Sequence, residues 1–396
     1  TIRGFVFEDV NYGGGAGRGL ISSGGVICSD ASVELFSGVT GVFIRQTTLD
    51  SLGEYKFNGL ATGSYVVRVV TQTVTSSRTG YVPGTHLAVP TYRTDGSLGT
   101  ALPVTNEVGG HEPAETDAND AGSGDQIDVN TWQFIAGPTG YAQTGTMVTV
   151  PSINATVSNI DFGFNFDVIT NTNDIGAGSL RQFVFNADGL DNIGLSQDGF
   201  ASDTEHAIWM ISNGTSAAGL RSDHDYFTAG VATIALQTSL PILNDPVILD
   251  ATLQPGYSGS PVVVLDGSLA GAGVNGLELL APGCEVRGLT IGGFDGSGIV
   301  VSAIDCLVAA NWIGIDATGS AALANNADGI TVWSDGAIIG GLVEDEQERL
   351  ARQKQQTTTA PVPGAPAGSP GASTPGVAPP VAPAPAPPDA GSRGRG

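Results

Sequence analysis

The sequence GLELLAPGCEVRGLTIGGFDGSGIVVSAIDCLVAANWIG, at residues 276–314, contains one pattern twice, at an offset of 22 residues. GLEL at 276–279 recurs as GIVV at 298–301, and CEV at 284–286 recurs as CLV at 306–308. Each copy carries short apolar segments separated by Gly, Asp and Asn, which favour tight turns. A fixed period of this kind indicates a stack of similar structural units.

The next copy of the pattern is longer. GITV at 329–332 begins 31 residues after GIVV, which is one period of 22 plus nine extra residues. We expect residues 316–323 to form an enlarged corner that bulges from the stack, where a partner could make contact. Asn311 and Asn325 or Asn326 are expected at turns, where a side-chain amide can bond the backbone of the neighbouring coil.

The period predicts a right-handed parallel β-helix. A coil of 22 residues, at ~3.3 Å per extended residue, is long enough for three short strands and their turns. One coil cannot bury its own apolar face, so the stability must come from stacking. The offset predicts two ladders of stacked side chains, one of Leu277, Ile299 and Ile330, the other of Val286, Val308 and Ile339.

The whole chain divides into three segments and is predicted to be all-β. Residues 1–167 alternate between apolar strands and glycine turns, which predicts an antiparallel β-sandwich, although an acidic stretch at about 105–130 is expected to be a solvated loop. Residues 168–341 form the predicted β-helix, with a short N-terminal capping helix at 180–184. Residues 342–396 are predicted to be a short charged helix, which would cap the last coil, followed by a disordered Pro/Ala/Gly-rich tail.

Several motifs of the first two segments resemble those of bacterial surface proteins. GFVFEDVNYGGGAGR, TTLDSLGEYKFNGLATGSYVVRV and IDFGFNF resemble a serine-aspartate-repeat B-type domain, a transthyretin-like or carboxypeptidase-regulatory-like sandwich. TNTNDIGAGSLRQFVFNAD and NWIGIDATGSAALANNADGI resemble the β-helix repeat regions of very large secreted bacterial proteins. That family continues with further coils, whereas this sequence departs from it after 339–341. The resemblance implies a secreted protein at the bacterial cell surface.

The resemblance also implies a calcium site near the N-terminus. B-type relatives bind Ca²⁺ in an aspartate-rich loop after the first strand, and Glu8, Asp9 and Asn11 match the start of that loop. The residues that follow lack the later carboxylates, so Asp50 and Glu54 would have to complete an oxygen ligand set. The alternative is a hydrogen-bonded Asx turn without a metal.

Two histidine-containing motifs and the cysteines leave further alternatives open. DTEHAIW and RSDHDYF, around His206 and His224, would bind a metal if they met, or would be polar loops. Cys284 and Cys306 lie one coil apart, so they are either two stacked thiols or an inter-coil disulfide. The disulfide is possible because adjacent strands lie close enough together for a bridge. Cys28 stands apart and is expected to be buried.

An enzyme is the less favoured interpretation of the β-helix. Polysaccharide lyases and hydrolases need a base or an acid–base pair, yet residues 246–341 contain neither His nor Lys, and Arg287 is their only basic residue. Arg287 beside Asp295 or Asp305 is the single lyase-like grouping. We therefore predict a chain without a catalytic site.

Composition restricts the partners. The net charge of −24 disfavours nucleic acid and anionic membranes, and no apolar run is long enough for a membrane-spanning helix. Because the chain begins at Thr1 on a strand pattern, we expect a processed product or part of a longer protein.

The predicted function is structural or adhesive: the chain would present the flanks of a stiff module to glycans or to cell-surface and matrix proteins. The alternatives are a polysaccharide lyase-like enzyme and a calcium-stabilised spacer.

Overall fold

A computed structural model describes residues 1–340 of the chain. Strands account for 32% of the residues and helices for 6%, which confirms the all-β class. The segment predicted as a charged helix and Pro-rich tail, 342–396, lies outside the described residues. Within them, no helix combines the length and the apolar character that crossing a membrane would require.

The N-terminal half contains two main sheets that share one hydrophobic core. In the first sheet, the order β2-β1-β12-β7-β8 is extended by β5, which pairs with β1. Its strands are β1 (Ile2–Glu8), β2 (Val26–Ile27), β5 (Glu54–Phe57), β7 (Val89–Asp95), β8 (Leu102–Val104) and β12 (Phe162–Asn165). The second sheet has the order β11-β6-β3-β4 and contains β3 (Ser32–Ser37), β4 (Phe43–Thr48), β6 (Gly63–Val69) and β11 (Thr146–Val150). A separate pair is formed by β9 (Gln126–Ile127) and β10 (Phe134–Ala136).

Alternation along the strands explains how these sheets bury their core. In β5, Tyr55 and Phe57 are buried whereas Lys56 between them is exposed, as the period of two residues predicts. Tyr55 also donates a hydrogen bond from its hydroxyl to the carbonyl of Ile160, so its polar end is satisfied inside the core. The parallel pairing of β1 with β12 joins the beginning of this half to its end.

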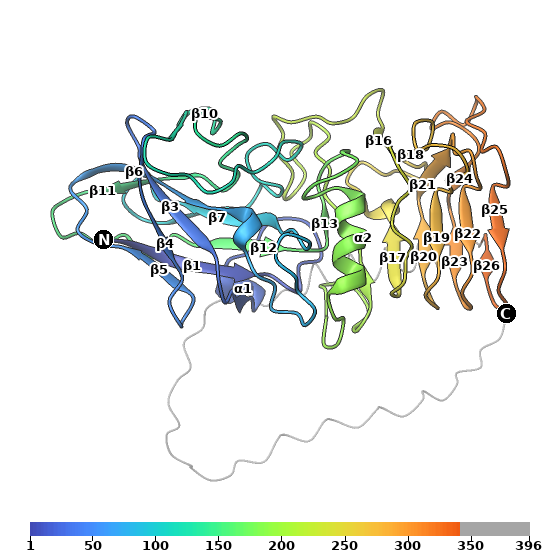
Figure 1. The fold of residues 1–396 in the computed structure, drawn as a ribbon, viewed down its shortest axis with the longest axis horizontal. Helices are drawn as coiled ribbons and strands as arrows, with labels where there is room; N and C mark the ends of the chain where they lie inside the picture. Colours follow the sequence, from blue (N-terminus) through green and yellow to red (C-terminus); the bar gives the residue numbers. More distant parts are fainter. Residues whose placement is uncertain (341–396) are drawn as a thin grey trace, which may run out of the picture.

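Helix α2 (Leu180–Gly189) forms where the sequence predicted a short helix. Ser179 caps it by accepting a hydrogen bond from the backbone N–H of Gln182. Its apolar side packs into the core of the C-terminal half, while Asn186 donates to the carbonyls of Leu87 and Phe166 in the N-terminal half. The helix therefore lies between the two halves, as Figure 1 shows. The other helical turns are α1 (Leu20–Ser23) and the 3₁₀ turns η1 (Thr71–Thr73) and η2 (Ala251–Leu253).

The C-terminal half is built from parallel sheets in which successive strands come from successive coils. One sheet contains β14 (Glu205–His206), β17 (Val247–Asp250), β20 (Glu285–Arg287), β23 (Leu307–Ala309) and β26 (Ile338–Ile339). A second contains β16 (Ala232–Ala235), β18 (Val263–Asp266), β21 (Leu289–Gly292) and β24 (Trp312–Ile313). A third contains β19 (Leu277–Leu279), β22 (Ile299–Val301) and β25 (Ile330–Val332), and a short pair joins β13 (Val168–Ile169) to β15 (Ile208–Trp209).

The stacking register agrees with the offset read from the sequence. Leu277 pairs with Ile299, which pairs with Ile330, and Val286 pairs with Val308, which pairs with Ile339. The two predicted ladders are therefore confirmed. The coils lie side by side along the longest axis of the molecule, so that Thr1 and β26 are at opposite ends of the described chain (Figure 1).

Asparagines connect neighbouring coils, as predicted. Asn311 accepts a hydrogen bond from the N–H of Leu289 at 2.9 Å and donates to the carbonyl of Val286 at 2.8 Å. Asn325 accepts from the N–H of Phe294 at 3.1 Å. Each amide thus bonds the preceding coil, which satisfies backbone groups at corners where the strand ladder is interrupted.

The enlarged corner at 316–323 is closed by its own hydrogen bonds. The carboxylate of Asp316 accepts from the backbone N–H groups of Ser320 and Ala321, each at 3.1 Å, and from the hydroxyl of Thr318. These bonds lower the pKa of Asp316, the backbone bond from Ala321 most. The loop is an Asx-type turn that needs no ligand to hold its shape.

Candidate functional site

The residues predicted to bind calcium separate into two groups. Glu8, at the end of β1, is buried and accepts hydrogen bonds from the hydroxyl of Ser76 at 2.9 Å and from the N–H of Ser77. Asp9 is also buried and forms a two-pronged ion pair with Arg18. These carboxylates are held by protein donors.

Asn11 lies beside the same loop, against the C-terminal half. Its backbone carbonyl accepts a hydrogen bond from the N–H of Asp198, and its side chain accepts from the N–H of Ser196. Asn11 therefore joins the loop after β1 to the segment that follows α2 by hydrogen bonds.

Asp50 and Glu54 form the second group, around Lys56. The ammonium of Lys56 pairs with both carboxylates, and Asp50 also accepts from the N–H groups of Leu52 and Glu54. The structure thus brings Asp50 and Glu54 together on Lys56, whereas Glu8 and Asp9 are bonded to other donors. Residues 1–340 contain no group of three or more His, Cys, Asp or Glu arranged to hold a metal. Calcium stays a prediction.

Four charged side chains meet where the two halves join, and we call them the junction cluster: Glu8, Arg78, Asp167 and Glu205. Arg78 pairs with Asp167 at 2.5 Å and with Glu205 at 3.4 Å, and the exposed fraction of each of these three side chains is 6% or less. Glu205 begins β14 of the first parallel sheet, whereas Glu8 ends β1 of the N-terminal half. The cluster therefore connects the halves through buried polar side chains.

The junction cluster has an excess of acid. Three carboxyl groups face one guanidinium, and taking an unpaired carboxylate out of water is costly. Burial raises the pKa of Glu205 well above its usual range; the neighbouring Asp167 raises it further, while Arg78 opposes the shift. Burial also raises the pKa of Glu8, against bonds from Ser77 and the charge of Arg78. The arrangement favours a protonated carboxyl at Glu205.

Apolar side chains from both halves surround the same junction. Tyr12 and Val89 of the N-terminal half pack in one buried cluster with Val168, Ile208 and Met210. Arg18 extends the contact by pairing with Asp198 as well as Asp9. The halves are thus joined by a continuous buried interface.

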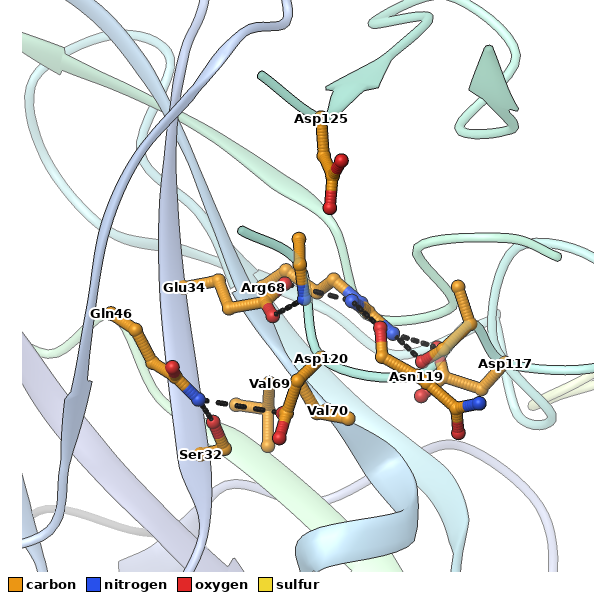
Figure 2. A network of polar contacts seen from close by, with 12 residues as sticks. Ser32, Glu34, Gln46, Arg68, Val69, Val70, Asp117, Asn119, Asp120 and Asp125 are labelled. Carbon is orange, nitrogen blue, oxygen red and sulfur yellow. Dashed lines mark hydrogen bonds and ion pairs between the residues drawn. The ribbon is translucent and has the colours of Figure 1, made fainter. Parts of the chain in front are cut away.

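A second buried network lies within the N-terminal half, and Figure 2 shows it. Arg68 of β6 is fully buried and pairs with Glu34 at 2.7 Å and with Asp117 at 3.2 Å. Asp117 also accepts from the N–H of Thr71 at 2.8 Å and from that of Gln143 at 3.2 Å. Asp117 is thus bonded to Arg68 of β6, to Thr71 of η1, which follows that strand, and to Gln143, which precedes β11.

This network corrects the expectation that the acidic stretch at 105–130 is a solvated loop. Val108, His111, Asp117, Ala118 and Ala121 of that stretch are buried. The reason is that Arg68, inside an otherwise apolar strand, needs buried carboxylate partners, and Asp117 supplies one. A charged residue in the run VVRVV was the sequence signal that could have indicated this network.

The two histidine motifs lie in different surroundings. His206 is buried in β14 with its ring stacked on Phe200, whereas His224 lies 3.0 Å from carboxylate oxygens of both Glu112 and Asp223. The hydrogen bond from Arg221 is the main cause that lowers the pKa of Asp223. The ion pair of Arg221 with Asp223 and the contacts of His224 with Glu112 and Asp223 account for the polar residues of the second motif.

The coil corners use their acidic side chains in local bonds. Arg287 pairs with Glu285 on the same strand at 3.1 Å, and neither Asp295 nor Asp305 is its ion-pair partner in the described part of the chain. Asp295 lines a hollow of about 490 Å³, where it accepts from the N–H of Gly273 at 2.6 Å and from the amide of Asn326 at 3.0 Å. The predicted lyase-like grouping is thus not assembled.

The three cysteines are buried free thiols. Cys284 and Cys306 stack one coil apart, as predicted, without a bridge between them. Burial raises the pKa of Cys284 to about 11. These thiols are therefore packed as small apolar side chains.

Comparison of the chain with protein-family models, with curated proteins and with solved structures found no match.

Proposed function

We propose that this chain is a non-catalytic structural and adhesive module of a large bacterial surface protein. In this proposal the N-terminal half is a transthyretin-like, B-type β-sandwich, and the C-terminal half is a short right-handed parallel β-helix with α2 at its N-terminal end. The surface location rests on the sequence motifs at residues 4–18, 47–69 and 311–330.

The observation that carries the proposal is the buried junction between the halves. Arg78 links Asp167 and Glu205, and the apolar cluster around Ile208 continues the contact. A hinged pair of domains would need a small and hydrated contact surface, because relative motion exposes it. A buried junction, with polar and apolar side chains from both halves, instead supports a stiff rod that keeps its two ends apart.

The corners of the coils support the same interpretation. Asn311 and Asn325 bond the preceding coil, and Asp316 closes its own loop. Polar side chains in these corners therefore stabilise the stack. The exposed flanks, including the hollow beside Asp295, remain available to glycans or to proteins of a matrix or another cell. In the calcium form of the proposal, Asp50 and Glu54 bind the ion at the sandwich end.

The proposal is tested with the full chain on two properties. Beads that carry the chain are measured for retention on mucin glycans, on fibronectin and on bacterial cells, against beads that carry serum albumin. Small-angle scattering measures the maximum dimension between about 0.05 and 1 M salt, which should stay constant because the junction is screened little. Retention no better than albumin on every surface would remove the adhesive part. Cleavage of pectin or alginate that is lost in Arg287→Ala would replace the proposal with an enzyme.

A further inference from the structure

Three Asn–Gly pairs in the chain differ in how the fold holds them. They are Asn58–Gly59, in the connection between β5 and β6, Asn213–Gly214 and Asn275–Gly276. In such a pair, the backbone nitrogen of the glycine can attack the side-chain carbonyl carbon of the asparagine, because glycine has no side chain to obstruct the approach. The reaction needs a glycine N–H without a hydrogen-bond partner and an asparagine side chain that can turn towards it.

The fold blocks this reaction at Asn213. The N–H of Gly214 donates to the carbonyl of His224 at 2.9 Å, so the attacking nitrogen is already engaged. The side-chain amide of Asn213 donates to the carbonyl of Pro255 at 2.9 Å, and its oxygen accepts from the N–H of Thr215 at 3.2 Å. Both reacting groups are therefore held by other partners.

Asn275 is held in the same way between two coils. Gly276 is buried, and its N–H donates to the carbonyl of Ser297 at 2.9 Å. The side chain of Asn275 accepts from the N–H of Ser297 at 2.8 Å and donates to the carboxylate of Glu278 at 2.9 Å. The stacking of the coils therefore protects this pair.

The first pair lacks these constraints. Asn58 and Gly59 are both exposed, and within residues 1–340 the N–H of Gly59 donates to no acceptor. No atom lies within 4 Å of the position that a β-carbon on Gly59 would occupy, so the space around the glycine is open. The side chain of Asn58 has one hydrogen bond in the described chain, in which its oxygen accepts from the hydroxyl of Thr1 at 3.1 Å. The amide can therefore turn towards the glycine nitrogen.

Two donors favour the reaction at this pair. The guanidinium of Arg45 donates to the backbone carbonyl of Asn58, which belongs to the same peptide unit as the Gly59 nitrogen. That nitrogen becomes nucleophilic when it loses its proton, and the negative charge then spreads onto the carbonyl oxygen, where a charged donor stabilises it. The hydroxyl of Thr1 donates to the side-chain oxygen that gains negative charge during the attack.

We propose that Asn58 is a site of spontaneous deamidation in the folded protein and that Arg45 accelerates the reaction. The Gly59 nitrogen bonds to the side-chain carbon of Asn58, and ammonia leaves with the proton that this nitrogen gave up. Water then opens the cyclic imide at either carbonyl, which leaves aspartate or isoaspartate at position 58. Either product adds a negative charge, and isoaspartate also inserts an extra carbon into the backbone between β5 and β6. This inference is independent of the proposed function.

The test follows the three asparagines of the full chain by peptide mass spectrometry during incubation near neutral pH, with isoaspartate detected by enzymatic methylation. A second incubation in urea measures the same reactions in the unfolded chain. Arg45→Gln removes the donor on the Asn58 carbonyl. Arg3→Gln is the matched control, because Arg3 is also exposed but contacts Ser158 and Glu54 instead. Circular dichroism checks that each variant folds.

In the folded parent, we expect Asn58 to convert at least about tenfold faster than Asn213 and Asn275, whereas the three should convert at similar rates in urea. Arg45→Gln should slow the conversion of Asn58 about three- to tenfold in the folded chain and leave it unchanged in urea. Arg3→Gln should match the parent. If Asn58 converts no faster than the other two asparagines in the folded parent, the site is wrong, and an unchanged rate in Arg45→Gln would overturn the role of Arg45.

Discussion

Replacing Glu205 with glutamine should stabilise the protein, although it removes a member of a buried ion pair. Glu205 is fully buried, and its pKa is raised first by that burial and then by Asp167, against the attraction of Arg78. The fold therefore holds a proton on Glu205 at pH values where the unfolded chain has released it. Glutamine imitates the protonated form, and its amide can donate to Asp167 as a carboxylic acid would.

The sign and size of the effect follow from proton linkage. Above the ordinary pKa of 4.5, the unfolded parent loses its proton while the folded parent keeps it, so the parent becomes less stable as pH rises, by up to ~1.4 kcal/mol per pH unit. The E205Q variant has no carboxyl group at this position, so its stability does not fall with pH in this way. Its advantage in free energy of unfolding should be below ~1 kcal/mol near pH 5 and should grow to about 3 kcal/mol near pH 7, as long as Glu205 stays protonated in the fold.

Urea unfolding of the full chain, followed by circular dichroism at about pH 5, 6, 7 and 8, measures this difference. Glu8 keeps its raised pKa in both proteins, so its contribution cancels. Glu285→Gln is the matched control, because Glu285 lies in the same parallel sheet but its side chain is 26% exposed in its pair with Arg287. The control should change stability by less than ~1 kcal/mol at every pH.

The opposite result would refute the reasoning. If Glu205 is ionised and its pair with Arg78 stabilises the junction, E205Q leaves a buried guanidinium with one partner fewer. The variant would then be less stable than the parent by several kcal/mol near neutral pH, with no advantage that grows as pH rises.

Three further outcomes are expected. Asn311→Ala should lower the free energy of unfolding by about 2 kcal/mol, because two backbone groups lose their partner. The control Asn326→Ala, at an exposed side chain, should lower it by less than ~0.5 kcal/mol. Equal losses in the two variants would contradict the role of Asn311 between coils. A thiol reagent should label Cys284 and Cys306 slowly in the folded chain and all three cysteines after unfolding without reductant, and a single reactive thiol would instead reveal a bridge. If calcium binds, a chelator should lower the melting temperature of the parent by a few degrees and leave Asp50→Asn unchanged, whereas a parent that ignores the chelator would remove the calcium proposal.

Local signals in the sequence were sufficient to predict most of the strands and the way in which the coils stack. The 22-residue offset predicted which residues pair between coils, because parallel strands in register repeat the same side-chain environment. The i, i+3, i+4 spacing after Ser179 predicted α2, and the alternation around Lys56 predicted which side of β5 is buried. These features depend on residues close together or on a fixed period, and both are visible in a linear chain.

The sequence by itself therefore determined the all-β class, the ladders of the coils and the amides at their corners. Only the tertiary structure decided how the halves join and which charges are buried. Arg78, Asp167 and Glu205 are separated by 89 and 38 residues; Glu205 lies in the motif DTEHAIW, but nothing in that motif indicates Arg78 or Asp167 as its neighbours. Asp117 was similarly indistinguishable from its solvated acidic neighbours until β6 placed Arg68 beside it. The energy of a buried charge depends on which distant groups surround it, and that information exists only once the chain has folded.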